Sequence, residues 1–202
     1  MFAERLRQKL SGVINLDADQ IGALQAHCEL LLRWNKVLNL TSIGSLEKIV
    51  ERHYGESLFL GTHMPFNVLQ IADIGSGAGF PGIPVAVLRP DCSVTLIEAN
   101  SRKAVFLREA TRQLGNVRVL PRRAEAVEEA FDYATSRAVS YADLTPVLRK
   151  IAKRAGLLTG AEAPPQQLGF DWRDPIALPW GDQRFLRMGV SRETHTHVSI
   201  TA

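Results

Sequence analysis

Apolar side chains recur at every third or fourth position over about the first sixty residues, which is the period of helices buried on one face. Three segments show this pattern: residues 2–13, 17–38 and 45–61. An Asp or Ser that can cap a helix stands at the start of the second and third segments. We therefore predict an N-terminal helical extension over residues 1–62.

From residue 63 onward, short β-rich runs alternate with helical segments. The β-rich runs lie at residues 68–71, 93–97, 117–120, 131–135 and 156–159, and the helical segments at residues 83–88, 101–114 and 141–155. Such alternation is typical of a mostly parallel sheet with helices on both faces. Residues 185–190 and 198–201 are expected to form a C-terminal antiparallel hairpin. We therefore predict an α/β domain over residues 63–202.

The composition is that of an ordinary globular protein, with 46% hydrophobic and 22% charged residues. No apolar run reaches the roughly 18 residues that a membrane helix requires. The N-terminus lacks the apolar core of a signal peptide, so we expect a cytoplasmic protein without a membrane segment. Cys28 and Cys92 are too few for a disulfide framework or a thiolate zinc site, and no ligand cluster predicts a metal.

Positive charge is concentrated in the second half of the chain. The formal net charge is only +3, yet residues 102–154 hold twelve basic and six acidic side chains, a local charge of +6. Arginine supplies most of the basic groups, and its planar fork suits phosphate. Charge alone leaves two interpretations open: a solvated basic surface, or an electrostatic footprint for nucleic acid.

A glycine-rich segment connects the first expected strand to the helix that follows it. Residues 71–82 read IADIGSGAGFPG, with four glycines from Gly75 to Gly82. Glycine permits positive φ angles and lets a ligand approach the backbone closely. In an α/β sheet, this pattern indicates the first turn of a nucleotide-binding site outside the carboxyl end of the strand.

Two cofactors fit the glycine segment. Residues 77–82 match the G-x-G-x-x-G dinucleotide fingerprint, which predicts NAD. Residues 73–79 match D-x-G-x-G-x-G, a pattern typical of S-adenosylmethionine-dependent methyltransferases. Asp73 would repel a pyrophosphate but could face an ammonium group through water. Phe80 is large where a dinucleotide loop needs a small residue, so both residues favour S-adenosylmethionine.

Further candidates stand where the next strands end. Glu98 follows the second strand, about 20 residues after the glycines, where an acid accepts hydrogen bonds from ribose hydroxyls. Ala124 and Glu125 follow the third strand, where an adenine ring would lie, although Glu125 alone is as well explained as a solvated acid. Arg137 follows the fourth strand and could clamp a carboxylate or a phosphate bidentately, or pair with a nearby aspartate.

The motifs that are missing narrow the chemistry. No Asn/Asp-Pro-Pro-aromatic tetrapeptide follows the fourth strand, which disfavours methylation of an exocyclic amine. Neither cysteine stands at a strand end, which disfavours a covalent attack on a pyrimidine. Guanine N7 has a lone pair and no proton to remove, so its methylation requires alignment and exclusion of water more than acid–base chemistry. The sequence is compatible with that reaction.

Several segments together carry a resemblance to a known family. They are residues 34–41 (WNKVLNLT), 52–53, 73–84, 103 with 106–107, 123–125 and 136–138. In these segments the chain resembles the glucose-inhibited division protein B family, the guanine-N7 methyltransferases of small-subunit ribosomal RNA. The resemblance covers about residues 4–160. It implies a class I, Rossmann-like methyltransferase fold that binds S-adenosylmethionine.

The resemblance also implies roles for individual residues. The implied S-adenosylmethionine contacts are Gly75, Phe80, Ala124, Glu125 and Arg137, and the residues implied to line the same pocket are Asp73, Gly77 and Glu98. Asn39 and Thr41, near the mouth of the pocket, are implied to help form the site of the target base, and with Arg137 they are the expected catalytic residues. The implied reaction is methyl transfer to N7 of one guanine in the decoding-region loop of bacterial 16S ribosomal RNA. We expect a monomer that acts on this RNA or on the 30S subunit.

The chain departs from the family pattern at four places. It has Thr159 where a lysine is expected, Glu56 where an aspartate is expected, and THTH at residues 194–197 instead of Glu-Arg-His, and its loop over residues 161–167 is shorter than expected. None of these positions is an expected cofactor contact. Two alternatives stay open: an NAD-dependent oxidoreductase, and a non-catalytic RNA-binding or ribosome-assembly factor on the same fold.

Overall fold

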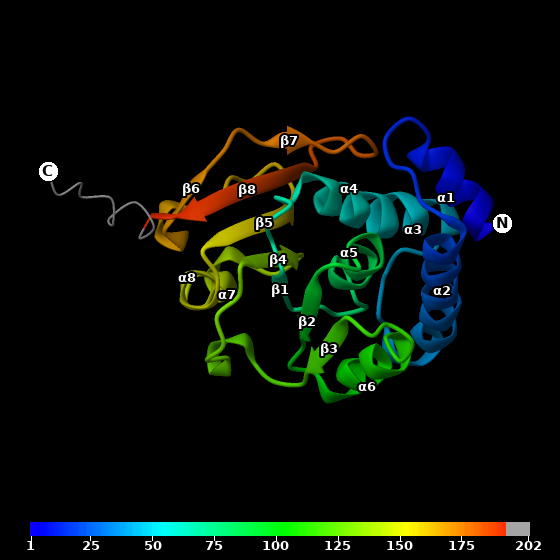
Figure 1. The fold of residues 1–202 in the computed structure, drawn as a ribbon, viewed down its shortest axis with the longest axis horizontal. Helices are drawn as coiled ribbons and strands as arrows, with labels where there is room; N and C mark the ends of the chain where they lie inside the picture. Colours follow the sequence, from blue (N-terminus) through cyan, green and yellow to red (C-terminus); the bar gives the residue numbers. More distant parts are fainter. Residues whose placement is uncertain (193–202) are drawn as a thin grey trace, which may run out of the picture.

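The computed structural model describes residues 1–192, which form one sheet with helices packed on both faces (Figure 1). The helices before the sheet are α1 (Phe2–Leu10), α2 (Ala18–Leu38), α3 (Leu46–Ile49), a π-helix (Val50–Gly55) and α4 (Glu56–His63). The predicted start of α2 is confirmed, because the Asp17 carboxylate accepts a hydrogen bond from the Gln20 amide at 2.8 Å. The division of the chain near residue 62 stays a prediction.

The sheet has parallel strands on one side and antiparallel strands on the other. The strands are β1 (Gln70–Ile74), β2 (Ser93–Ile97), β3 (Val117–Leu120), β4 (Tyr133–Arg137), β5 (Arg154–Thr159), β6 (Phe170–Trp172), β7 (Ile176–Ala177) and β8 (Phe185–Ser191). Their order is β3-β2-β1-β4-β5-β8-β6, and β7 pairs with β8. The strands β1 to β5 run parallel, whereas β8 is antiparallel to β5, β6 and β7. This confirms the predicted mostly parallel α/β sheet.

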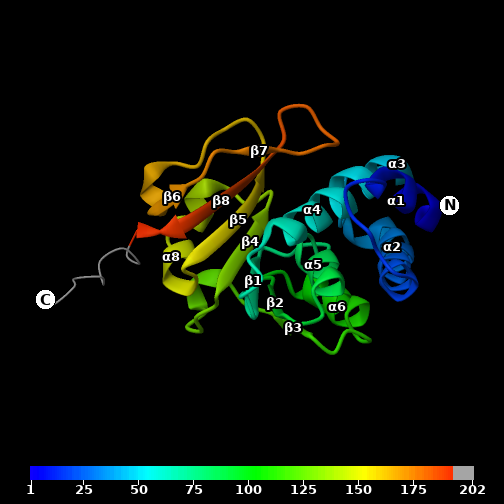
Figure 2. The ribbon, with the colours of Figure 1, turned by 45° about the horizontal axis from the view of Figure 1, so that its top comes forward.

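The two faces of the sheet bury separate cores. The helices after β1 are α5 (Gly82–Leu88), α6 (Ser101–Ala110), α7 (Tyr141–Leu144) and α8 (Leu148–Ile151), with short 3₁₀ turns η2 (Ala124–Ala126) and η3 (Gln166–Leu168). Because side chains alternate along a strand, Ile71 packs with the core of α1 to α6 and its neighbour Ala72 packs with α7 and α8. Figures 1 and 2 show the same division, with α1 to α6 on one side of the sheet.

Several predicted elements differ in the structure. The helix predicted over residues 45–61 is divided into α3, the π-helix and α4, and the helix predicted over residues 101–114 ends at Ala110. The fourth strand begins at Tyr133 rather than at residue 131. The single helix predicted over residues 141–155 is wrong: Pro146 stands between α7 and α8, where its missing N–H interrupts helical hydrogen bonding, and β5 already begins at Arg154.

The C-terminal part is also richer than predicted. The sequence pattern did not indicate β6 and β7, which are short and depend on β8 for their pairing. Residues 185–190 of the predicted hairpin fall in β8, and residues 198–201 lie outside the described residues. Over residues 1–192, none of the helices combines the length and the hydropathy needed to cross a bilayer.

Candidate active site

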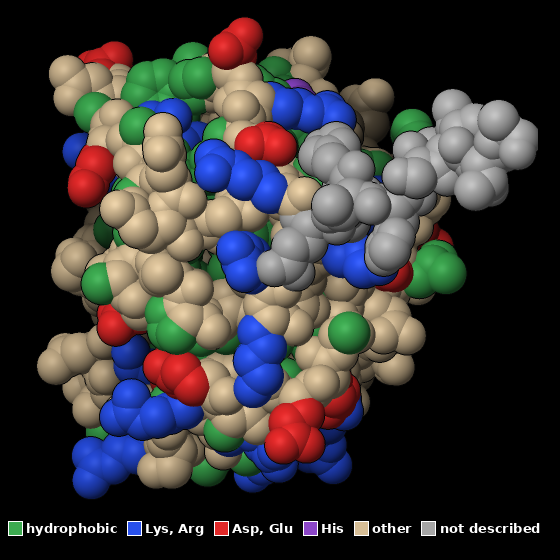
Figure 3. Space-filling view, turned by 90° about the vertical axis from the view of Figure 1, so that its left-hand side faces the viewer, with side chains coloured by type: hydrophobic (Ala, Val, Ile, Leu, Met, Phe, Trp, Pro, Cys, Tyr) green, Lys and Arg blue, Asp and Glu red, His purple; other side chains and the backbone are tan. Residues whose placement is uncertain are grey.

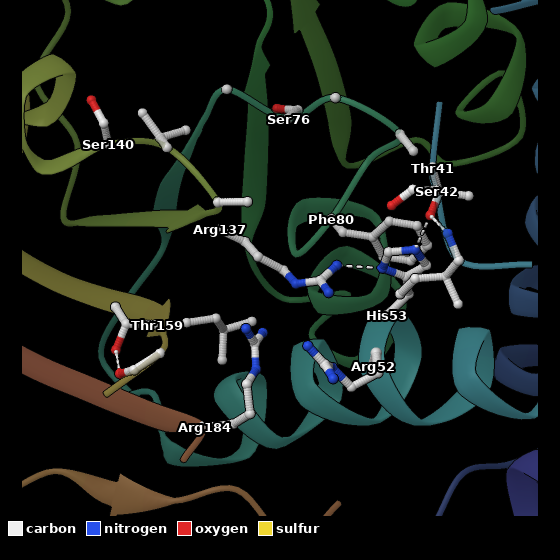
Figure 4. Close-up of a pocket in the computed structure, with 18 of the residues that line it drawn as sticks. Thr41, Ser42, Arg52, His53, Ser76, Phe80, Arg137, Ser140, Thr159 and Arg184 are labelled. Atoms are coloured by element: carbon white, nitrogen blue, oxygen red, sulfur yellow. Dashed lines mark hydrogen bonds between the residues drawn. The ribbon is translucent and has the colours of Figure 1, made fainter. Parts of the chain in front are cut away.

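A cavity of about 1080 Å³ opens at the carboxyl edge of the parallel strands (Figure 4). Six parts of the chain line it: the loop after α2, the π-helix, the glycine loop after β1, the first turn of α6, the ends of β4 and β5 with the segments that follow them, and the residue before β8. The lining residues from these parts include Asn39, Thr41, Arg52, His53, Gly75, Gly77, Phe80, Arg137, Thr159 and Arg184. The cavity therefore collects residues that are far apart in the sequence.

The glycine loop has a backbone that other residues adopt only with strain. Gly75, Gly77 and Gly79 have φ angles of 69°, 56° and 89°. A Cβ at Gly75 would also lie 2.6 Å from Cγ2 of Val139, closer than van der Waals contact allows. The amides of Gly75 and Ser76 both donate to the Ile97 carbonyl, at 2.9 and 3.1 Å, which ties the start of the loop to β2. The loop is thus built to hold a tight, fixed bend.

Asp73 lies beneath this loop and not in the cavity. Its side chain is fully buried and accepts hydrogen bonds from the Gly82 amide and the Thr135 hydroxyl, both at 3.1 Å. Burial raises the pKa of Asp73 to about 6. In this position the carboxylate fastens the start of α5 to the end of β1. The sequence interpretation expected Asp73 to face the ammonium group of the ligand, but the side chain is not among the residues that line the cavity.

Glu98 holds the other side of the loop. At the end of β2, its Oε2 accepts a hydrogen bond from the Gly77 amide and its Oε1 accepts one from the Asn100 amide, each at 2.8 Å. The side chain is buried next to the cavity wall and is not among the residues that line the cavity. Its role toward a ribose stays a prediction.

His27 in α2 connects the N-terminal helices to the glycine loop by a hydrogen bond, and the sequence patterns did not indicate this residue. Nε2–H of His27 donates to the Ala78 carbonyl at 3.0 Å, and the Tyr54 hydroxyl donates to Nδ1 at 2.9 Å. A carbonyl only accepts, so this pair fixes the neutral tautomer with the proton on Nε2. Burial lowers the pKa of His27 to about 4.

Phe80 packs against the rings of His27, Tyr54 and His53 and also lines the cavity. Its ring lies edge-on to Tyr54, with centroids 5.1 Å apart, and stacks on the imidazole of His53, with centroids 4.5 Å apart and planes 11° from parallel. His53 itself comes from the π-helix, so this stack packs the N-terminal helices against the glycine loop. The predicted residue Phe80 therefore lines the cavity with a ring that is held on both sides.

His53 links Arg137 to Thr41. An Arg137 Nη1–H donates to Nδ1 of His53, and Nε2–H of His53 donates to Oγ1 of Thr41 at 2.7 Å (Figure 4). Burial and the Arg137 guanidinium lower the pKa of His53 to about 3, so the ring is neutral near pH 7. The Ile43 amide also donates to Oγ1 of Thr41, at 3.1 Å. Both lone pairs of that oxygen are occupied, which leaves its own hydrogen to donate.

The loop after α2 is closed by Asn35. Its side-chain amide donates to the Thr41 carbonyl at 3.0 Å and accepts from the Thr41 amide at 2.8 Å. Asn39 ends α2 in the left-handed conformation, with φ of 47°, a conformation that asparagine tolerates well. This turn brings Asn39 and Thr41 to the cavity.

One buried carboxylate, Glu56, lies behind the cavity wall among three arginines. Arg184 binds it with Nε at 3.1 Å and Nη2 at 2.7 Å, Arg52 approaches with Nε at 3.2 Å, and Arg137 with Nε at 3.5 Å. Glu56 is fully buried. Burial is the largest influence on Arg137 and lowers its pKa to about 10. The arginine at position 184 carried no sequence signal, because it lies in the irregular segment before β8.

The predicted residues therefore divide into two groups. Those that line the cavity are Asn39, Thr41, Gly75, Gly77, Phe80 and Arg137, and those that do not are Asp73, Glu98, Ala124 and Glu125. Ala124 and Glu125 form η2 after β3, and the carboxylate of Glu125 is exposed. Within residues 1–192, no group of three or more His, Cys, Asp or Glu side chains could hold a metal.

The face that carries β6, α7 and α8 has no continuous basic patch among the described residues that are visible on it. Figure 3 shows Lys and Arg side chains there, with Asp and Glu side chains between them. Arg118, in the basic stretch, pairs with Glu129. The two interpretations of that stretch both stay open, whereas the charge around Glu56 has a defined geometry.

The chain matches a known protein family over most of its length. The family model GidB, described as rRNA small subunit methyltransferase G, matches residues 20–160. Proteins named ribosomal RNA small subunit methyltransferase G are similar to the chain: one from Xanthomonas campestris pv. campestris (strain B100) is 46% identical over 129 residues, and one from Halorhodospira halophila is 42% identical over 149. The alignments cover 62% and 72% of this chain, and 60% and 70% of those proteins.

Solved structures share the fold at low sequence identity. A SAM-dependent methyltransferase from Aquifex aeolicus superposes with a TM-score of 0.54 at 14% identity, covering 70% of this chain and 92% of that one. The mitomycin 7-O-methyltransferase MmcR gives a TM-score of 0.60 at 15% identity, covering 82% of this chain and 60% of that one. These likenesses confirm the predicted class I, Rossmann-like architecture. Since the family model matches well over half of its residues, the chain belongs to the GidB family.

Proposed function

We propose that the protein is an S-adenosylmethionine-dependent methyltransferase that acts on N7 of a guanine in the decoding-region loop of bacterial 16S ribosomal RNA. The observation that carries the proposal is the glycine loop with three positive φ angles that forms one wall of the cavity, in a chain of the GidB family. The names of the relatives support ribosomal RNA as the substrate, either free or in the 30S subunit. Because that substrate is cytoplasmic in bacteria, we propose a cytoplasmic enzyme, and a monomer.

The loop residues fit S-adenosylmethionine by shape. Gly77 lines the cavity, and the nearest atom to a Cβ placed there would be the Gly75 carbonyl oxygen, 3.8 Å away. The space next to this backbone is therefore open for a ligand. Glu98, bound to the Gly77 amide, has lone pairs left for ribose hydroxyls. When bound, S-adenosylmethionine supplies the electrophilic methyl group of its sulfonium.

The acceptor side is proposed to orient a base through Thr41. The Thr41 oxygen already accepts two hydrogen bonds, so its hydroxyl can act toward a ligand as a donor. Guanine presents O6 as an acceptor next to N7. A hydrogen bond from Thr41 to O6 would therefore fix the edge of the base that carries N7. His53 and Arg137 position this hydroxyl, because they hold the oxygen from behind.

The proposed reaction requires no base. Guanine N7 attacks with a lone pair, and alignment of the attacking atom with the methyl group supplies most of the rate. His53 remains neutral near pH 7 as a hydrogen-bonding group, because its pKa is about 3. Asp73, whose pKa is raised to about 6, lies beneath the loop and is separated from the cavity. The titratable groups near the site thus hold its geometry.

The geometry favours this function over an NAD-dependent oxidoreductase. A dinucleotide loop places a small residue where helix and strand pack closely. Because β1 ends at Ile74, a dinucleotide loop that begins at Gly75 would have its third small residue at position 80, where Phe80 instead stacks its ring on His53 at 4.5 Å. Titration with S-adenosylhomocysteine and with NAD separates the two, because only the first should bind.

Methyl transfer from labelled S-adenosylmethionine tests the proposal directly. The substrates are 30S subunits and free 16S RNA from cells that lack this protein, and strand cleavage at N7-methylguanosine maps the product. We expect label at one guanine of the decoding-region loop. Absence of transfer to both substrates would leave only the non-catalytic RNA-binding factor. A methyl group on another atom or in another loop would contradict the proposed specificity.

A further inference from the structure

The wall of the cavity behind Arg137 carries more positive charge than the protein neutralises. Arg52, Arg137 and Arg184 surround the single carboxylate of Glu56, which leaves a local charge of +2. Their side chains are only 35%, 11% and 19% exposed. Lys103 and Glu162 also line the cavity, but their charges cancel. A mostly buried, uncompensated charge is unfavourable unless a counter-charge binds to it.

The hydrogen-bonding capacity of this cluster is also incompletely used. Among residues 1–192, the buried Nε atoms of Arg52 and Arg137 have no hydrogen-bond partner of good geometry, although both approach Glu56. Arg184 directs Nε and Nη2 to Glu56, and no hydrogen bond involves its Nη1 within the same residues. Guanidinium groups with free N–H donors form bidentate pairs with phosphate. The cluster is thus prepared to receive an anion with several oxygens.

The position of the cluster separates it from the expected cofactor half. In the sheet order, β2 with Glu98 lies on one side of β1, whereas β4, β5 and β8 lie on the other. Thr159 pairs with Phe185, so Arg184 stands at the same edge as the end of β5. Figure 4 shows Ser76 of the glycine loop at the top, Arg52 and Arg184 at the bottom, and Arg137 between them. An anion held by the lower pair would belong to the acceptor and not to the cofactor.

We propose that Arg52 and Arg184, held in place by Glu56, bind a phosphodiester group of the RNA strand that presents the guanine. This inference rests on the proposed function, since it assigns the acceptor strand to the same cavity. Glu56 fixes the two guanidinium groups side by side, so the phosphate contact is formed with little loss of side-chain freedom. With Thr41 at the base edge, the strand would be held at two points on either side of Arg137.

The test uses Arg52→Gln and Arg184→Gln in the full-length protein, with methyl transfer to RNA measured over a range of KCl concentrations. Each variant should raise the KM for RNA by about tenfold or more, as for the loss of a charge-assisted hydrogen bond. The slope of log affinity against log salt should fall by about 0.7 for each single-strand phosphate contact that is lost. The affinity for S-adenosylhomocysteine should stay within about twofold of wild type, because the cofactor half is untouched.

Arg89→Gln is the matched control. Arg89 also pairs with a carboxylate, Asp91, at 3.1 Å, and its side chain is 13% exposed. It follows α5 at the opposite edge of the sheet, so its loss should change neither the KM nor the salt slope. Arg184→Lys keeps the charge without the fork, and should therefore retain the salt slope while it raises the KM.

Three outcomes would overturn the inference. A loss of S-adenosylhomocysteine affinity with an unchanged salt slope would assign the arginines to the methionine carboxylate. Unchanged KM and salt slope in a folded Arg184→Gln protein would mean that the arginines only balance Glu56. Equal salt slopes for Arg184→Lys and Arg184→Gln, both below wild type, would remove the charge argument. Failure of the wild-type protein to methylate RNA is a separate result, which contradicts the proposed function itself.

Discussion

Replacement of His27 by phenylalanine should loosen the glycine loop, because this imidazole connects the N-terminal helices to the loop backbone. It donates to the Ala78 carbonyl at 3.0 Å and accepts from the Tyr54 hydroxyl at 2.9 Å. Phenylalanine keeps an aromatic ring next to Phe80, 5.2 Å away between centroids in the native structure, but it removes both hydrogen bonds.

The size of the effect follows from the groups that lose their partners. A buried polar group without a partner costs about 1–3 kcal/mol. His27→Phe leaves the Ala78 carbonyl and the Tyr54 hydroxyl without their hydrogen-bond partner, and the Cys28 sulfur is only a weak alternative for the hydroxyl. The free energy of unfolding should therefore fall by about 2–5 kcal/mol. Tyr54→Phe leaves only Nδ1 of His27 without a partner and should lower the free energy of unfolding by about 1–3 kcal/mol. The double variant leaves only the Ala78 carbonyl without a partner, so it should cost about 1–3 kcal/mol, well below the sum of the two single variants.

Urea unfolding followed by circular dichroism measures the four stabilities, and calorimetry measures S-adenosylhomocysteine binding. Because Ala78 belongs to the loop, His27→Phe should weaken binding more than Tyr54→Phe does. His63→Phe, at the end of α4, changes a half-buried histidine away from the loop and should leave binding unchanged. Wild-type stability and binding in His27→Phe, or costs that simply add in the double variant, would refute the reasoning.

Three other predictions concern the cavity wall and the buried ionisable groups. Arg137→Ala should lower the rate of methyl transfer by about 100-fold, since alignment is lost; wild-type turnover would contradict its role. Glu56→Gln should lower the free energy of unfolding in urea by about 3–5 kcal/mol, because it leaves the arginines without their carboxylate; the exposed control Glu47→Gln should change little, and equal effects would contradict the argument. The lowered pKa values of His27, about 4, and His53, about 3, mean that the unfolded state binds more protons below the ordinary value of 6.5, so stability is complete above that pH and is lost on acidification. Asp73, with a pKa raised from 3.8 to about 6, binds a proton in the folded state first and so cancels the effect of one histidine. The free energy of unfolding should therefore fall by about 1.4 kcal/mol per pH unit between pH 6 and 4.5, and His27→Phe should remove most of this pH dependence.

The sequence predicted the elements whose signal is local. β2 and β3 begin and end at the predicted residues, because each is a short β-rich run next to a helical pattern. The capping residues Asp17 and Ser45 likewise mark helix starts that depend on neighbouring residues only. The strands β6 and β7 were missed because segments of three and two residues carry no periodicity, and they exist through their pairing with β8.

The site was predictable where one segment supplies the geometry, as in the glycine loop. It was not predictable where distant segments meet. His27 and His53 stand on different helices and converge only because both rings pack against Phe80. The arginine at position 184 joins them from the other end of the chain through the pairing of β5 with β8. The spacing of residues along the sequence cannot predict contacts between segments that are so far apart.

The π-helix between α3 and α4 sets the orientation of the helices on either side of it. It presents Arg52 and His53 to the cavity while the next residue, Tyr54, is directed into the core. If the same six residues tightened to ordinary α-helical turns, one flank would rotate by about 100° relative to the other. A substitution that favours the tighter turn should therefore turn Arg52 and His53 away from the cavity, even where it alters no side chain of the site.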